Sequence, residues 1–358
     1  MPPKVVIRCD AAPAIGYGHV VRCLALADAL RYGHGCEVSF AMLQGPEGFE
    51  QVRDNGYDVH YPRPGPATLG EGEWLQELLA NHQQQVLILD VRTDLATSAV
   101  QSIRATGVLI VTIDDPSDRR LLADLAFYPP VPQVGRLDWT GFTGQRFVGW
   151  DWVLLRPQFA KHAQRTRARE ADSMAGPPST NRRLTLLVTM GGSDPAGLTL
   201  MALDAVERID SDFRTLVVIG SAFMHDAALA DWLASAKRAY QFCRDVADMA
   251  SLMAEADLAV SSFGGTAYEL AAMGVPAIYL CLSHDHAESC AAFVAKKMAV
   301  SFGEYPDVKA AELTKEIGSL LMNSQKRVAM SERNTRLVDG KGIERVAEQI
   351  RNSIIAAV

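Results

Sequence analysis

Apolar and polar positions follow two rhythms along the chain. Short runs rich in Val, Ile and Leu alternate with longer stretches in which apolar residues recur at helical spacing. Runs of the first kind are typical of buried strands, and stretches of the second kind are typical of helices that cover a sheet. This alternation predicts βαβ units and a parallel sheet. In the first part of the chain the expected strands are residues 5–7, 37–41, 57–61, 86–90, 108–114 and 123–128.

The same alternation restarts near residue 184. The expected strands here are residues 184–188, 215–219, 258–261 and 276–280, and the expected helices are residues 198–206, 267–273, 309–338 and 342–355. Two successive runs of alternating strands and helices predict the α/β class. The simplest architecture is a pair of doubly wound Rossmann-like domains that face each other across a cleft.

A polar segment separates the two runs. Residues 165–183 are rich in charge and are interrupted by Gly176, Pro177 and Pro178, a composition typical of an interdomain connection. A chain of 358 residues is also too long for a single hydrophobic core. We therefore expect an N-terminal domain, a linker, a C-terminal domain and a closing helix, over residues 1–164, 165–183, 184–338 and 339–358 respectively.

Composition and charge argue against several classes of protein. A formal net charge of −7 disfavours nucleic acid or an anionic membrane as the main partner. The longest apolar run, residues 275–282, is too short to span a bilayer, and no signal peptide is recognisable. The six cysteines form no Cys-x-x-Cys pair and indicate reduced thiols. We expect a cytoplasmic protein without a membrane span, and its oligomeric state stays open, a monomer included.

The clearest candidate for chemistry lies between the first strand and the first helix, within residues 8–30. Gly16 and Gly18 allow the backbone to approach a ligand closely. The N–H groups and the dipole of the helix that follows favour an anion at this place. His19 stands at the helix start, where the dipole favours the neutral imidazole that a general base needs. The alternative is a histidine that only occupies a helix start.

Two glycine loops in the second half of the chain have the geometry of anion sites. Gly191, Gly192 and Ser193 follow a strand and precede a helix, so the glycine N–H groups can reach a phosphate while Ser193 caps the helix. An ordinary turn that needs glycine is the alternative. The same arrangement recurs one unit later, at Ser262, Gly264, Gly265 and Thr266.

Glu269 follows this second loop by one helical turn. Its carboxylate could accept hydrogen bonds from two ribose hydroxyls, or it could serve as the capping-box partner of Thr266. Neither glycine loop matches the P-loop or the dinucleotide fingerprint, which disfavours an ATPase and nicotinamide chemistry.

Two further polar groups stand near expected strand ends. His284, Asp285 and His286 are adjacent on an expected loop, where three neighbouring residues rarely face one ion, so we expect no metal and no other cofactor. We place these residues along the cleft. Asp114 and Asp115 end a strand at its carboxyl edge, where a ligand site and a solvated turn are both open.

Four sequence blocks together carry a resemblance to known enzymes. They are Gly16-Tyr17-Gly18-His19 with Arg22-Cys23-Leu24, Leu155-Arg156-Pro157 before Phe159, Gly191-Gly192-Ser193-Asp194-Pro195, and Gly264-Gly265-Thr266 with Glu269. In this order they resemble the UDP-2,4-diacetamido-2,4,6-trideoxy-β-L-altropyranose hydrolases of pseudaminic acid biosynthesis. The chain is more distantly similar to the GT-B glycosyltransferase that adds N-acetylglucosamine to lipid I.

The resemblance implies a GT-B fold and a metal-independent enzyme that releases UDP from a UDP-sugar with inversion. It implies that His19 activates water or an acceptor hydroxyl. Residues expected on the sugar side are Gly16, Tyr17, Gly18, Arg22, Asp285 and His286. Residues expected to hold UDP are Gly191, Gly192, Ser193, Ser262, Gly264, Gly265, Thr266 and Glu269.

Two segments differ from the hydrolase pattern. The chain has Asp90-Val91-Arg92-Thr93 where the hydrolases usually read Asp-His-Tyr-Gly, and Asp285-His286 where they read Asn-Gln. Both changes fall on the sugar side, so the identity of the sugar stays open. Transfer to an acceptor alcohol is the alternative to hydrolysis, and a non-catalytic nucleotide-sugar binding protein is a third hypothesis.

Overall fold

The computed structural model describes residues 2–11, 18–43, 45–62, 70–160, 183–244 and 246–356. The chain divides into two compact units. The first unit comprises Met1–Pro130, Val134–Arg156 and Lys341–Val358, and the second comprises Val131–Gln133 and Pro157–Gly340. The expected linker lies outside the described residues except for Arg183.

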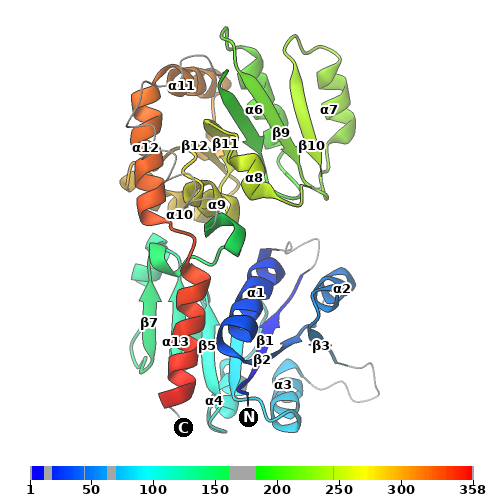
Figure 1. Ribbon diagram of the computed structural model, residues 1–358, viewed down its shortest axis with the longest axis vertical. Helices are drawn as coiled ribbons and strands as arrows, with labels where there is room; N and C mark the ends of the chain where they lie inside the picture. Colours follow the sequence, from blue (N-terminus) through cyan, green and yellow to red (C-terminus); the bar gives the residue numbers. More distant parts are fainter. Residues whose placement is uncertain are drawn as a thin grey trace. The chain divides into compact units, whose positions relative to one another are not determined.

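The described residues of the first unit form a seven-stranded sheet in the order β3-β2-β1-β4-β5-β6-β7 (Figure 1). Every neighbouring pair of strands is parallel. The central strands β1 and β4 are almost wholly buried, which is why the sequence shows them as continuous apolar runs. The bounds are β1 (Lys4–Cys9), β2 (Glu37–Ala41), β3 (Asp58–His60), β4 (Val86–Asp90), β5 (Leu109–Ile113), β6 (Leu125–Tyr128) and β7 (Gln145–Val148).

Helices from both ends of the chain cover this sheet. Leu24 and Leu30 at the first helix and Ile343 and Ile350 at the last helix belong to one hydrophobic core together with Ile7 of β1. The C-terminal helix therefore packs on the first unit, beside α1 in Figure 1. The helices of this unit are α1 (Gly18–Asp28) with a π-helical turn (Ala29–Gly33), α2 (Pro46–Asp54), α3 (Glu71–Asn81), α4 (Thr97–Arg104) and α13 (Gly342–Ala356).

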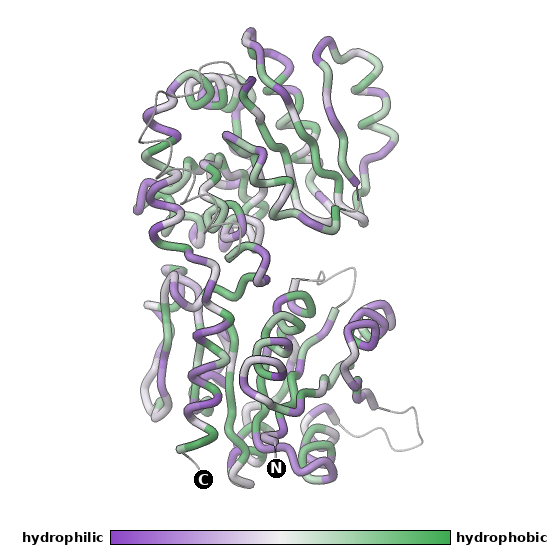
Figure 2. Tube along the Cα trace, viewed as in Figure 1, coloured by the Kyte–Doolittle hydropathy of each residue, from purple (hydrophilic) through white to green (hydrophobic). Residues whose placement is uncertain are grey.

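The described residues of the second unit form a six-stranded parallel sheet in the order β10-β9-β8-β11-β12-β13. Its strands are β8 (Thr185–Thr189), β9 (Arg214–Ile219), β10 (Tyr240–Arg244), β11 (Leu258–Ser262), β12 (Ala277–Cys281) and β13 (Ala299–Glu304). Its helices are α6 (Leu198–Glu207), α7 (Asp226–Leu233), α8 (Met249–Met253), α9 (Gly265–Ala272), α10 (His284–Ala295), α11 (Ala310–Met322) and α12 (Ser324–Leu337). Apolar residues concentrate along the strands of both sheets (Figure 2).

Both sheets reverse their strand order at one point. The chain leaves β1 toward β2 on one side, whereas β4 lies on the other side; β8, β9 and β11 repeat this arrangement. At such a switch point the loops after the two strands diverge, and ligands of α/β proteins bind there. The predicted α/β class with two doubly wound units is confirmed.

The structure differs from the expected elements at three strands and one helix. The sequence analysis missed β7, β10 and β13, which carry mostly half-buried or exposed residues and therefore lack an apolar run. The helix expected over 309–338 is interrupted at Asn323, whose side chain accepts a hydrogen bond from Lys326 N and caps α12. In the described part of the chain, no helix has the length and apolar character needed to cross a bilayer.

Candidate active site

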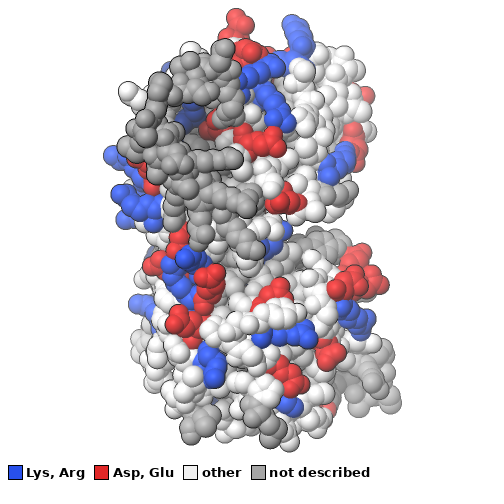
Figure 3. All heavy atoms as spheres, viewed as in Figure 1, with Lys and Arg blue, Asp and Glu red and all other residues white. Residues whose placement is uncertain are grey.

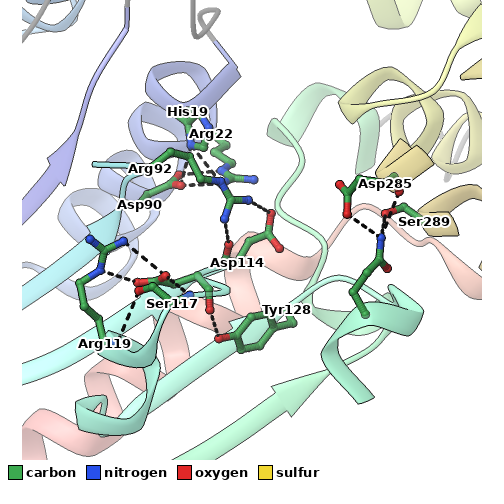
Figure 4. Close-up of polar contacts among 12 residues, drawn as sticks. His19, Arg22, Asp90, Arg92, Asp114, Ser117, Arg119, Tyr128, Asp285 and Ser289 are labelled. Carbon is green, nitrogen blue, oxygen red and sulfur yellow. Dashed lines mark hydrogen bonds and ion pairs between the residues drawn. The ribbon is translucent and has the colours of Figure 1, made fainter. Parts of the chain in front are cut away.

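The site of the first unit forms where β1 and β4 end. Cys9 and Asp90 are paired at the ends of these parallel strands, and α1 begins at Gly18, so its first turn lies near Asp90. His19 Nδ1 lies 2.7 Å from Asp90 Oδ1, although the two residues are 71 positions apart (Figure 4). The sequence analysis missed Asp90. A signal was present, because an aspartate is the last residue of an apolar strand at the carboxyl edge of the sheet.

The Asp90 carboxylate accepts hydrogen bonds from three residues of one helix face. Arg22 Nε donates to Oδ2 at 2.6 Å and Arg22 Nη2 donates to Oδ1, while Cys23 Sγ lies 3.2 Å from Oδ2. His19, Arg22 and Cys23 are three and four positions apart, the spacing that places side chains on one face of a helix. Asp90 is only 1% exposed.

Electrostatics keep this carboxylate ionised. Burial opposes the charge, but the Arg22 guanidinium and the hydrogen bonds from Arg22 and His19 outweigh it and hold the pKa of Asp90 well below its usual range. Asp90 in turn raises the pKa of Arg22 despite the burial of that guanidinium.

The ionised Asp90 determines which nitrogen of His19 carries the proton. A carboxylate without a proton can only accept, so we assign the hydrogen to Nδ1 and the free lone pair to Nε2. Arg22 Nη2 lies 3.2 Å from the same Nδ1, but with this tautomer both atoms are donors and the contact is no hydrogen bond. The arrangement presents an oriented imidazole whose Nε2 receives no hydrogen bond from the described residues, as a general base requires.

A second group of charges lies at the end of β5. Arg92 Nη2 lies 2.9 Å from Asp114 Oδ2. Asp115 is 1% exposed and accepts hydrogen bonds from Arg119 Nε at 3.0 Å and Ser117 N at 2.8 Å. The solvated-turn alternative is therefore wrong for Asp115.

Arg119 also fixes the loop that follows Asp90. Its Nη1 donates to the carbonyl oxygen of Thr93 at 2.6 Å and to that of Leu95 at 3.2 Å. Tyr128 donates its hydroxyl to the carbonyl oxygen of Asp115 at 2.6 Å, so the end of β5 is held as well.

The other residues expected on the sugar side have varied positions. Gly16 and Tyr17 lie outside the described residues. Gly18 is the first residue of α1, and Arg22 is engaged with Asp90. Asp285 and His286 belong to the second unit.

The loop expected at residues 284–286 is wrong, because α10 begins there. His284, Asp285 and His286 form the first turn of this helix, and Ser283 caps it through the backbone N–H of His286. Asp285 Oδ1 accepts a hydrogen bond from Gln133 Nε2 at 3.0 Å, so this carboxylate already has a donor.

In the second unit the two glycine loops lie side by side. Gly191 and Gly192 follow β8, and Ser262, Gly264 and Gly265 stand at the end of β11, the neighbouring strand. A Cβ atom on Gly191 would lie 3.7 Å from Ser262 Oγ. Apart from adjacent residues and the local helix backbone, no described atom lies within 4 Å of the Cβ positions of Gly192, Gly264 and Gly265, so a ligand can approach these backbones.

The expected cap of α6 is wrong. This helix begins at Leu198, too far along the chain for Ser193 to reach its first N–H groups. Asp194 caps it instead: Oδ1 accepts from Leu198 N and Oδ2 from Thr199 N, both at 2.8 Å. The φ of Asp194 is +44°, in the left-handed region that Asp tolerates better than most residues.

The capping-box alternative for Glu269 is also wrong. The N-cap of α9 is Gly264, so Thr266 lies inside the first helical turn and is not a cap. Glu269 is half-buried in the next turn. Its expected contact with a ribose stays a prediction.

Gly220, which the sequence analysis missed, supports the first glycine loop. A Cβ atom on Gly220 would lie 2.2 Å from Gly192 O and 2.6 Å from Gly191 O, and Ala222 N donates to Gly192 O at 3.1 Å. The loop after β9 therefore packs directly on the glycine backbone, and only glycine fits there.

Comparisons with known proteins relate this geometry to glycosyltransferases. The model of the glycosyltransferase family 28 C-terminal domain matches residues 185–350. The chain is 24% identical over 345 residues to the spore coat polysaccharide biosynthesis protein SpsG of Bacillus subtilis, covering 96% of each chain. It is 26% identical over 344 residues to the UDP-N-acetylglucosamine--N-acetylmuramyl-(pentapeptide) pyrophosphoryl-undecaprenol N-acetylglucosamine transferase of Acidithiobacillus ferrooxidans, covering 92% of this chain and 93% of that protein.

A solved structure has the same architecture. The crystal structure of Acinetobacter baumannii MurG superposes with a TM-score of 0.72 at 17% identity, over 98% of this chain and 100% of that one. The chain therefore has the GT-B fold, and residues 185–350 are similar to the glycosyltransferase family 28 C-terminal domain. Membership of the altropyranose hydrolase family stays a prediction.

The ion pairs of Asp90 yield a prediction about stability. Asp90→Asn should lower the free energy of unfolding at neutral pH by about 2–4 kcal/mol, because Arg22 loses the charge that compensates its burial. A carboxyl whose pKa is lowered by folding stabilises the protein above its ordinary pKa and loses that contribution as the pH falls below it. Between about pH 5 and pH 2 the wild type should therefore lose more stability than the variant.

Urea denaturation at each pH measures this difference. The control is Asp118→Asn, because that carboxylate also pairs with an arginine, Arg120, but its side chain is 76% exposed. The control should keep the stability of the wild type at neutral pH. Equal pH dependence in the wild type and Asp90→Asn would contradict the ionised, buried Asp90.

Proposed function

We propose that the protein is a UDP-sugar enzyme that transfers the glycosyl group to an acceptor alcohol, with His19 as the general base. The observation that carries this proposal is the contact of His19 with the buried, ionised Asp90 at the switch point of the first sheet. The names of the relatives support transfer, because one is an N-acetylglucosamine transferase and another acts in spore coat polysaccharide biosynthesis. A role in the synthesis of a surface glycan agrees with both.

The first unit supplies the proton acceptor of this reaction. His19 Nε2 takes the proton of the acceptor hydroxyl while the hydroxyl oxygen attacks the anomeric carbon. The bond between that carbon and the UDP oxygen breaks with inversion, and the electron pair leaves on UDP. Asp90 remains ionised because it pairs with Arg22. Its carboxylate stabilises the His19 imidazolium through Nδ1.

The second unit supplies donors for the leaving group. The backbone N–H groups at Gly191, Gly192, Gly264 and Gly265 and the N-terminus of α9 would stabilise the charge on UDP. Ser262 and Thr266 border the same loops, and Glu269 would accept hydrogen bonds from the ribose. In the described part of the chain no three His, Cys, Asp or Glu side chains cluster as a metal site. On the face drawn in Figure 3, acidic and basic side chains are interspersed.

Hydrolysis is the second candidate, and it needs the same residues. Water would replace the acceptor alcohol at His19, and the products would be free sugar and UDP. The motifs around residues 16–24 and 155–157 favour this reaction, because they resemble the altropyranose hydrolases. The comparisons favour transfer, which is why we place transfer first.

The first test measures UDP release from a panel of UDP-sugars, with and without acceptor alcohols. We expect release to depend on an acceptor, and His19→Asn should reduce turnover roughly 10²- to 10⁴-fold while UDP affinity stays the same. The loss follows because the variant has no basic nitrogen at this position. The control is His34→Asn, at the end of the π-helical turn, which should keep full activity.

Running the wild-type reaction in ¹⁸O-labelled water identifies the nucleophile. Label in the free sugar would establish hydrolysis in place of transfer. Label in UDP would mean attack at phosphorus and would contradict the role of His19. Binding of UDP-sugars without any turnover would leave only the hypothesis of a nucleotide-sugar binding protein.

A second prediction concerns the nucleotide site. Gly220→Ala should weaken UDP binding about tenfold or more, because the new methyl group must displace the backbone of Gly191 and Gly192. Isothermal titration calorimetry measures the change. Gly318→Ala in α11 is the control, since no described atom outside the local helix backbone lies within 4 Å of its Cβ position. Unchanged UDP affinity in a folded Gly220→Ala protein would argue against nucleotide binding by this loop.

A further inference from the structure

One charged pair beside the His19 site has no part in the mechanism above. Arg92 follows Asp90 by two positions, and Asp114 directly follows β5, two strands away from β1. Arg92 Nη2 lies 2.9 Å from Asp114 Oδ2, and Arg92 Nη1 donates to the carbonyl oxygen of Asp114. Figure 4 shows this pair next to His19, Arg22 and Asp90. The Arg92 and Asp114 side chains are 43% and 27% exposed, so a ligand can reach both.

Asp114 is held in an unfavourable state. Its φ is +52°, a left-handed conformation that costs free energy in every residue except glycine and is tolerated best by Asn and Asp. Burial raises the pKa of Asp114, and the positive charges of Arg22 and Arg92 offset this only in part. Residues with a strained backbone concentrate at functional sites, where selection for function retains them despite their cost in stability.

Asp114 is also the carboxylate of this cluster that has an oxygen available. Both oxygens of Asp90 accept hydrogen bonds from α1. Both oxygens of Asp115 accept from Arg119. Within the ranges that the structure describes, Asp114 Oδ2 accepts from Arg92 while Oδ1 accepts no hydrogen bond.

A purely structural role explains the pair poorly. The pair would tie the loop after β4 to the end of β5, but Arg119 already does so through the carbonyl oxygens of Thr93 and Leu95. An ion pair that is this exposed adds little to stability, because water screens its charges.

We propose that Asp114 binds a hydroxyl group of the substrate beside the reacting carbon, and that Arg92 is the positioning residue that holds its carboxylate. This inference rests on the proposed function and specifies the sugar-side recognition of the same site. A carboxylate only accepts hydrogen bonds, so Asp114 selects a ligand that carries a donor at this position. A site built in this way discriminates strongly against an analogue that lacks the donor.

The central experiment combines a protein variant with a substrate analogue. Asp114→Asn keeps the shape of the side chain and tolerates the positive φ. The substrates are the most active UDP-sugar and acceptor from the release panel and the monodeoxy analogues of each. In the wild type we expect one deoxy analogue to lose 10-fold or more in kcat/KM. In Asp114→Asn, kcat/KM for the parent substrate should fall about as much, and the penalty for that analogue should shrink.

The analogue that shows this effect identifies the source of the hydroxyl group. If the affected analogue is a deoxy UDP-sugar, Asp114 binds the donor sugar. If it is a deoxy acceptor, Asp114 binds the acceptor. Arg92→Lys should retain most of the discrimination, and Arg92→Gln should lose it. Asp118→Asn is the matched control, since this aspartate also pairs with an arginine but is exposed, and it should leave every ratio unchanged.

Two further measurements separate the possible failures. UDP affinity and the midpoint of thermal unfolding should not fall in Asp114→Asn, whereas a structural tie predicts a lower midpoint. Calorimetry should show that UDP-N-acetylglucosamine loses affinity relative to UDP in the variant if Asp114 binds the donor sugar. If every deoxy analogue loses the same factor in kcat/KM in Asp114→Asn as in the wild type, the inference is overturned while the proposed function stays intact. A wild type that does not bind UDP would contradict the proposed function itself.

Discussion

The site of the first unit depends on the hydrogen bonds and ion pair of one buried carboxylate. Asp90 ends a central strand and binds His19, Arg22 and Cys23 on a single face of α1. The charge of Arg22 makes it favourable to keep Asp90 ionised away from water, and the ionised carboxylate in turn fixes the orientation and the tautomer of His19. Without the ion pair of Asp90 and Arg22, the imidazole of His19 would be free to rotate, and its proton could move to the other ring nitrogen.

The two units share a topology and place different kinds of candidate groups at it. In each sheet the strand order reverses beside the central strand, and the loops that diverge there carry the candidate groups. In the first unit these groups are side chains that can move or hold a proton, at His19 and Asp90. In the second unit they are backbone N–H groups at Gly191 and Gly264, which can bind an anion without a charged side chain. The proposed function assigns the groups of the first unit to the nucleophile and those of the second unit to UDP.

Local patterns in the sequence predicted the buried strands and the glycine loops, because burial on both faces leaves a continuous apolar run and tight turns need glycine. The edge strands β7, β10 and β13 carry no such run. Asp90 was missed because its contact with His19 depends on strand order over 71 positions. Ser193 was expected to cap α6, but Asp194 does so. The left-handed backbone conformation of Asp194 cannot be read from the sequence. The first turn of α10 consists of polar residues, so the sequence analysis predicted a loop there, although Ser283 is the N-cap of the helix.

The central claim, that Asp90 holds His19 with its proton on Nδ1 and a free lone pair on Nε2, is open to direct observation. ¹⁵N NMR of protein labelled in its histidine rings distinguishes the two neutral tautomers by the chemical shifts of the ring nitrogens. The His19 signals are assigned by their loss in His19→Asn. At a pH where the imidazole is neutral, we predict protonated Nδ1 and unprotonated Nε2. A proton on Nε2 in the wild type would contradict the account, because Nδ1 would then have no hydrogen to donate to Asp90 and Nε2 no lone pair for the nucleophile's proton.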